Sequence, residues 1–146
     1  MLELGLKIFL SYLIGSFNGS LLVGKYLGGV DIRKIGSGNA GGTNALRTKG
    51  KVFAFLVISI DVGKGIIPVV LFPTMTMFGT DSLEVSREWL TYVCGAAVIF
   101  GHCFPVWFDF SGGKGAATTI GVLLGTSPFI LSVGMIIWLL ILVLIG

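Results

Sequence analysis

Charged and metal-binding side chains are scarce in this sequence of 146 residues. Asp, Glu, Lys and Arg make up 12% of it, which is about half the fraction typical of a soluble domain. One histidine and two cysteines provide no metal-site pattern, and we expect neither a metal nor a cofactor. On a single helix, Cys94 and Cys103 would lie about 13 Å apart along the axis, which is too far for a disulfide. No basic run with interleaved aromatic residues suggests nucleic acid as a partner.

Hydrophobic residues are abundant instead. They form 54% of the sequence, and the mean hydropathy of +0.98 indicates a protein of the bilayer. Pro128 divides the last apolar region, which is too long for one crossing, into a short helix over Ala116–Ser127 and a full span over Pro128–Gly146. We predict an all-α polytopic membrane protein with about five membrane helices, one of them short, in a single integral membrane domain of residues 1–146. The four apolar regions are Ile8–Val23, Val52–Phe72, Trp89–Phe108 and Gly115–Gly146.

The charges between the apolar regions predict the orientation. The segment after the first region carries six Lys or Arg residues against Asp31, whereas the segment after the second carries Arg87 against Asp81, Glu84 and Glu88. Because positive loops stay in the cytoplasm, we expect the N-terminus outside and the first and third loops inside. The first region lacks the basic start and the cleavage motif of a signal peptide, so we interpret it as a membrane helix.

Small and charged residues inside the apolar regions indicate how the helices pack. Glycines four apart, Gly15 with Gly19 and Gly121 with Gly125, are typical of close helix contacts in membranes. Asp61 and Lys64 share one face of the second region, where isolated charges would be costly. We therefore expect them to pair and to face the protein interior or a polar cavity. Two interpretations stay open: a structural ion pair, or a Lys64 that lends positive potential to an anion site.

Two polar, glycine-rich stretches stand between the apolar regions, at 35–51 and 111–115. Small residues leave backbone N–H groups uncovered, hydroxyls and amides add donors, and Arg47 adds a planar cationic group. Both stretches therefore suit a phosphate-like anion. The predicted orientation puts them on one side of the membrane, where they can share a site.

Two nucleotide-binding motifs are matched only superficially. The spacing of Gly36, Gly38 and Gly41 fits the dinucleotide fingerprint, but the required strand–turn–helix context is replaced by an apolar span. The second stretch differs from a Walker A loop because position 108 is Phe and Lys114 is followed by Gly. His102 lies near the cytoplasmic end of the third region, which leads into this stretch. It is either a packed structural residue or one that contacts a bound anion.

These residues resemble a known family, the bacterial membrane acyl-phosphate:glycerol-3-phosphate acyltransferases. The stretch Ser37-Gly-Asn-Ala-Gly-Gly-Thr-Asn44 with Arg47 resembles the first family motif, in which Gly42 replaces the usual Ala. Gly101-His-x-x-Pro105 followed by Phe108-x-Phe-x-Gly-Gly-Lys-Gly-x-Ala-Thr118 resembles the second. Tyr12-Leu-Ile-Gly-Ser16 and Asp61-x-x-Lys-Gly65 also match in order and spacing, so the resemblance covers essentially the whole chain.

The resemblance implies a seven-helix bundle of which this chain corresponds to the first part. The family's third motif, with His, Asn and Glu, follows the last helix and is not found here, so we expect a C-terminally truncated form. A separate C-terminal fragment or a second copy of the chain are the candidate protein partners. The implied reaction transfers an acyl group from acyl phosphate to the 1-position of glycerol 3-phosphate, giving lysophosphatidic acid for phospholipid biosynthesis in the cell inner membrane. The alternative is a non-catalytic phosphate- or lipid-binding protein.

The expected site combines residues from both motifs and the second region. We assign direct catalytic contacts to Ser37, Arg47 and His102. The remaining members are expected to bind substrate phosphate: Gly38, Asn39, Gly41, Gly42, Thr43, Asn44, Lys64, Gly112, Gly113, Lys114, Gly115 and Thr118.

Acyl phosphate is already activated, so the reaction needs no acyl-enzyme intermediate. Ser37 also has no adjacent base in the sequence, and we do not expect it to be acylated. The proton acceptor is either His102 or an oxygen of the acyl phosphate itself. We favour the second, substrate-assisted route, with His102 as a positioning group.

Overall fold

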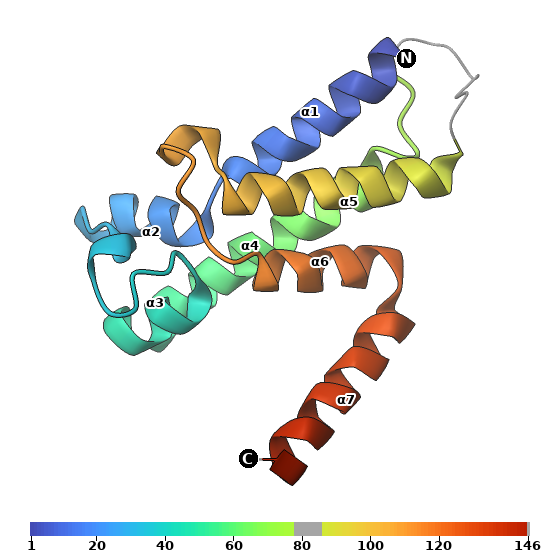
Figure 1. Cartoon of the computed structure of the whole chain (residues 1–146). Coiled ribbons are helices and arrows are strands. Elements are labelled where there is room, and N and C mark those ends of the chain that lie inside the picture. Colours follow the sequence, from blue (N-terminus) through green and yellow to red (C-terminus); the bar gives the residue numbers. More distant parts are fainter. Residues whose placement is uncertain (78–85, 146) are drawn as a thin grey trace.

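The computed structural model describes residues 1–77 and 86–145, and every regular element within these ranges is a helix (Figure 1). The α-helices are α1 (Leu2–Ser16), α2 (Gly19–Gly28), α3 (Gly42–Lys49), α4 (Lys51–Leu71), α5 (Arg87–Cys103), α6 (Ala116–Thr126) and α7 (Pro128–Ile145), and the short 3₁₀ helices are η1 (Ile32–Lys34) and η2 (Val106–Phe108).

Three segments of the described residues are long and apolar enough to cross a membrane: α4, α5 continued through η2, and α7. A fourth crossing results if α1 and α2 are counted together, and α6 is a shorter apolar helix. The predicted fold class, an all-α polytopic membrane protein, is confirmed. Both cysteines are free, as predicted. The acidic residues Asp81 and Glu84, which entered the orientation argument, lie outside the described residues.

The first apolar region differs from the prediction of one helix over Ile8–Val23. Helix α1 begins earlier, at Leu2, and the chain then bends by 46° between α1 and α2. The break falls at Phe17 and Asn18, where the Asn18 side chain accepts hydrogen bonds from the N–H groups of Ser20 and Leu21. Asn18 is therefore the N-cap of α2.

The early start of α1 places two charges inside the bundle. Lys7 is fully buried, and its Nζ lies 2.6 Å from Glu3 Oε1 and 2.6 Å from the carbonyl oxygen of Met75, which follows α4. Glu3 and Lys7 both precede Ile8, where the first apolar region was predicted to begin. They are instead one helical turn apart and pair with each other, which satisfies both charges away from water.

Glycines mediate the closest helix contacts. Helices α1 and α5 pack together, and so do α4 and α6 (Figure 1). A side chain at Gly15 would meet the backbone of Val98 in α5, and one at Gly121 would meet the carbonyl group of Val62 in α4. The prediction for Gly121 and Gly125 is confirmed, because both face α4.

The prediction that Gly15 and Gly19 form one contact face is wrong. The break separates them, so Gly15 packs on α5 while Gly19 packs on Val57 and Asp61 of α4.

Two connections meet at the end of the bundle that lies away from the N-terminus (Figure 1). Loop 1, residues 29–41, joins α2 to α3 and contains η1, and loop 2, residues 104–115, joins α5 to α6 and contains η2. The helix pairs α1–α5 and α4–α6 therefore bring the two glycine-rich stretches of the sequence together.

We predict that Gly15→Ala lowers the thermal unfolding midpoint of the purified chain in detergent micelles. A methyl group at this position overlaps backbone rather than a side chain that can move, and such overpacking costs about 1–3 kcal/mol. Gly5→Ala is the matched control, because Gly5 lies in the same helix with nothing within 4 Å of a new Cβ, and it brings the same gain in helix propensity. Equal midpoints for the two variants would contradict the close contact between α1 and α5.

Candidate functional site: an anion-binding cavity between two loops

A cavity of about 360 Å³ opens between loop 1, loop 2 and the helices that follow them. Most of the predicted site residues line it. The lining residues are Ser37, Asn39, Gly41, Gly42, Thr43, Asn44, Arg47, Asp61, His102, Lys114, Gly115, Ala116 and Ala117.

Two helix N-termini converge on this cavity. Helix α3 begins at Gly42 after the N-cap Gly41, and α6 begins at Ala116 after the N-cap Gly115. Neither N-cap has a side chain that could satisfy the first N–H groups of its helix. Unpartnered N–H groups and the positive end of the helix dipole both favour a bound anion. The cavity is therefore lined by two sets of backbone donors, one at the start of α3 and one at the start of α6.

The charged side chains around the cavity add to this preference. Arg47 of α3 and Lys114 of loop 2 both line it, and Asp61 of α4 is the acidic residue among the lining side chains. A guanidinium can bind two phosphate oxygens at once, and an ammonium acts as a point charge. The arrangement can hold a phosphorylated molecule, or two phosphate groups close together.

Loop 1 is folded around the side chain of Asn44. Its Nδ2 donates to the carbonyl oxygens of Ile32, Ile35 and Asn39 at 3.0–3.1 Å, and its Oδ1 accepts from the N–H of Ser37 at 3.0 Å. Asn44 was predicted to bind phosphate, and it does line the cavity. Its amide is nevertheless used within the loop, so its visible contribution is to hold Ser37 and Asn39 at the cavity wall.

Loop 2 turns back on the end of α5. The N–H of Gly112 donates to the Cys103 carbonyl at 3.1 Å, and the N–H of Gly113 donates to the His102 carbonyl at 3.2 Å. These two glycines were expected to approach a substrate phosphate with their backbone. They instead satisfy carbonyl groups at the last turn of α5 and do not line the cavity. A side chain at Gly113 would overlap the His102 ring and the Ala40 carbonyl, so glycine allows loop 2, His102 and loop 1 to meet.

A buried polar cluster of Asp61, Lys64 and His102 reaches the cavity through Asp61 and His102. Lys64 Nζ lies 2.8 Å from Asp61 Oδ1 and 2.9 Å from His102 Nδ1, which confirms the predicted ion pair. The cluster also binds backbone groups on both sides of the break between α1 and α2. Lys64 Nζ donates to the Phe17 carbonyl at 3.0 Å, and the Gly19 N–H donates to Asp61 Oδ1 at 3.0 Å.

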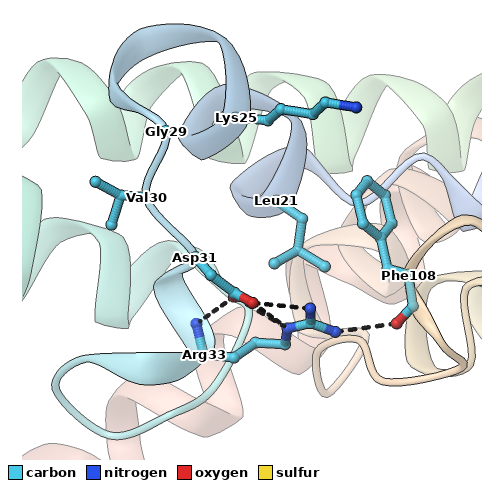
Figure 2. A pocket seen from close by; sticks show the side chains of 7 residues that line it. All are labelled: Leu21, Lys25, Gly29, Val30, Asp31, Arg33 and Phe108. Carbon is cyan, nitrogen blue, oxygen red and sulfur yellow. Dashed lines mark hydrogen bonds and ion pairs between the residues drawn. The ribbon is translucent and has the colours of Figure 1, made fainter.

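A single arginine ties the two loops together (Figure 2). The Arg33 guanidinium forms an ion pair with Asp31 at 2.8 Å, and its Nη1 donates to the carbonyl oxygens of Phe108 at 3.0 Å and Ser111 at 2.9 Å. It lies beside a small pocket of about 220 Å³ that Leu21 and Lys25 also line. The hydrogen bond from Arg33 holds the pKa of Asp31 below its ordinary value, which favours the charged carboxylate that pairs with Arg33.

Three other predicted residues lie away from the cavity wall. Gly38 is in loop 1 but does not line the cavity, Lys64 lies behind Asp61 and His102, and Thr118 is fully buried in α6. Neither the loop contact of Arg33 nor the capping role of Asn18 was predicted from the sequence, whereas Asp61, expected to face the interior or a polar cavity, does line the cavity. Within the described ranges, no group of three His, Cys, Asp or Glu side chains could hold a metal ion.

Nearly the whole chain is similar to proteins of one known family. Residues 5–146 match the family described as glycerol-3-phosphate acyltransferase. A curated protein of that name from Synechococcus elongatus is 43% identical over 122 residues, which cover 83% of this chain and 57% of that protein.

Two solved structures are also similar. The glycerol 3-phosphate form of PlsY (YgiH), an integral membrane glycerol 3-phosphate acyltransferase, superposes with a TM-score of 0.79 at 38% identity, covering 96% of this chain and 66% of that one. Its lysophosphatidic acid form superposes with a TM-score of 0.75 at 37% identity, covering 94% and 64%.

The chain thus spans less than two thirds of the length of that curated relative, while nearly all of its own residues match the family. The combined matches in sequence and structure show that this chain belongs to the glycerol-3-phosphate acyltransferase family.

Proposed function

We propose that this chain takes part in transferring a fatty acyl group from acyl phosphate to the 1-hydroxyl of glycerol 3-phosphate. The single observation that carries the proposal is the convergence of two helix N-termini, Arg47 and Lys114 on one cavity. Both proposed substrates carry a phosphate group, which such a cavity suits. The family match and the PlsY forms named for glycerol 3-phosphate and lysophosphatidic acid support the same assignment.

The reaction needs orientation and charge stabilisation more than covalent chemistry. The glycerol hydroxyl attacks the acyl carbon, an ester C–O bond forms, and the bond from the acyl carbon to the phosphate oxygen breaks. The hydroxyl proton ends on the departing phosphate. Holding two substrates in the reactive geometry can supply about 7–11 kcal/mol in favourable cases. Arg47 and Lys114 would offset the repulsion between the two phosphate groups and stabilise the charge on the leaving group.

The individual roles follow from the positions of the side chains. Ser37, Asn39 and Thr43 line the loop 1 side of the cavity and offer hydroxyl and amide donors to one phosphate. Gly115 and the first residues of α6 offer backbone donors to the other. Asn44, Gly112 and Gly113 act by shaping the two loops. Ser37 is a binding residue in this scheme, and we expect no acylated protein to be trapped.

The membrane setting would bring the acyl donor to the site by lateral diffusion. We place the chain in the bacterial inner membrane, with its N-terminus outside and both loops in the cytoplasm, where glycerol 3-phosphate is water-soluble and free to enter. The excess of Lys and Arg in the segment after the first region supports this orientation.

The direct test combines binding and turnover on the purified 146-residue chain. We expect calorimetric binding of glycerol 3-phosphate and formation of lysophosphatidic acid when acyl phosphate is added. In Arg47→Met, loss of a charged hydrogen bond worth about 1.5–3 kcal/mol would weaken glycerol 3-phosphate binding roughly 10- to 100-fold. Lys49→Met is the control, since it removes the same charge from the same helix at an exposed position that does not line the cavity.

Equal binding by these two variants would contradict the assigned anion site. Binding of glycerol 3-phosphate without any transfer would favour the alternative, a phosphate-binding protein that does not catalyse the reaction.

A second prediction concerns the contact between the loops. In Arg33→Gln, loop 2 loses both hydrogen bonds to its carbonyl groups, so we expect faster hydrogen exchange at the amides of residues 111–115 and several-fold weaker glycerol 3-phosphate binding. Lys34→Gln removes the same charge from the neighbouring exposed position in η1 and serves as the control. If exchange in loop 2 is the same in both variants, Arg33 does not hold the loop.

A further inference from the structure

The ring of His102 stands between the buried ion pair and the cavity. Its side chain is buried, its Nδ1 faces Lys64, and its Nε2 lies at the opposite edge of the ring, next to Gly113 of loop 2. His102 is also one of the residues that line the cavity. His102 is the only histidine of the sequence. In a neutral imidazole, one ring nitrogen donates a hydrogen bond and the other accepts one. Which nitrogen carries the proton therefore decides what His102 offers to a molecule in the cavity.

The contacts of Lys64 settle this choice. An ammonium group has three N–H donors and no acceptor. Lys64 Nζ has three acceptors within hydrogen-bond distance: the Phe17 carbonyl at 3.0 Å, Asp61 Oδ1 at 2.8 Å and His102 Nδ1 at 2.9 Å. The 2.8 Å contact with a carboxylate is that of a charged ammonium. All three hydrogens are thus directed to acceptors, and Nδ1 accepts one of them.

The other protonation states conflict with this geometry. A proton on Nδ1, whether in the other tautomer or in an imidazolium, would set two donors against each other at 2.9 Å. Asp61 Oδ1 is the alternative acceptor for such a proton, but it lies farther away, at 3.4 Å from Nδ1. It already accepts from Lys64 and from the Gly19 N–H at 3.0 Å. The proton of the neutral ring therefore lies on Nε2.

We propose that Lys64 and Asp61 are positioning residues that hold His102 as the Nε2–H tautomer, so that His102 donates a hydrogen bond into the cavity. Asp61 fixes the Lys64 ammonium, and the ammonium fixes Nδ1 as an acceptor. An Nε2–H group suits a phosphate oxygen and is unable to accept the proton of an attacking hydroxyl. Only the identity of the ligand, glycerol 3-phosphate, rests on the proposed function; the tautomer does not.

The tautomer is measurable in the native chain because it contains one histidine. The chain is labelled with ¹⁵N-histidine, purified through an affinity tag without histidine, and studied by two-bond ¹H–¹⁵N correlation NMR in detergent micelles at neutral pH. Only Nε2 shows a strong correlation to the ring proton Hδ2, so the two nitrogens are distinguished. We expect Nδ1 to resonate as an unprotonated nitrogen and Nε2 as a protonated one. An unprotonated Nε2, or two protonated nitrogens, would overturn the proposal.

A variant tests the cause of the tautomer. In Lys64→Met the donor to Nδ1 is gone and Asp61 Oδ1 becomes its nearest polar partner, so we expect the Nδ1–H tautomer to become the major form. Lys25→Met removes a charge of the same sign at an exposed position of α2 and should keep the native tautomer. A native tautomer in both variants would show that Lys64 does not fix His102, and the measurement on the unchanged chain stands even where Lys64→Met fails to fold.

The donor role is tested by adding glycerol 3-phosphate to the labelled chain while calorimetry records binding. We expect the Nε2 resonance to shift and Nδ1 to stay unprotonated. Binding without any change at Nε2 would overturn the donor role of His102. Absence of binding would count against the proposed function instead, and the tautomer of the ligand-free chain would still be decided by the first measurement.

Discussion

The buried ion pair between Asp61 and Lys64 organises the rest of this structure. It lies where the first span breaks, and each partner satisfies a backbone group that the break leaves exposed: Lys64 binds the Phe17 carbonyl at the end of α1, and Asp61 binds the Gly19 N–H at the start of α2. The charges also match the helix dipoles, with the cation at a C-terminus and the anion at an N-terminus. Burying two charges is costly unless their remaining hydrogen-bonding capacity is met, and here the broken helix and His102 meet much of it.

The cavity depends on two sets of contacts, those of the Asp61–Lys64 pair and those within and between the two loops. The pair fixes α4 against the first span and supports the ring of His102, while Asn44 folds loop 1 and Arg33 joins it to loop 2. The backbone donors of the site are thus held in place by side chains, those of Asn44 and Arg33, whose hydrogen bonds stay within the protein. This explains why so many of its residues are glycine, serine and asparagine, and why the charged groups that face the opening are few.

The sequence predicted much of this arrangement. Apolar runs predicted α4, α6 and α7 with ends close to those observed, whereas α5 ends at Cys103 and the predicted region continued through η2 to Phe108. The long spans were predictable because a membrane crossing needs about 20 apolar residues whatever its partners are. The Asp61–Lys64 pair was predictable because hydrocarbon leaves buried charges few other choices. The break at Phe17 was not predicted: the polar residues Ser16, Asn18 and Ser20 mark it locally, but the contacts with α4 that accompany it are tertiary. The capping roles of Gly112 and Gly113 escaped prediction for the same reason: their partners belong to the fold.

The contact of Lys7 with Glu3 and with the carbonyl group beyond α4 bears on how the chain is made. Charged residues at the centre of an isolated helix oppose its insertion by roughly 2.5–3.5 kcal/mol each. On its own, α1 is too short and too charged to leave the translocon as a stable crossing, and it qualifies as a span only together with α2. The carbonyl partner of Lys7 follows α4 in the chain, so this contact forms only once α4 has been synthesised. The first segment is therefore held in place partly by a residue that is made much later.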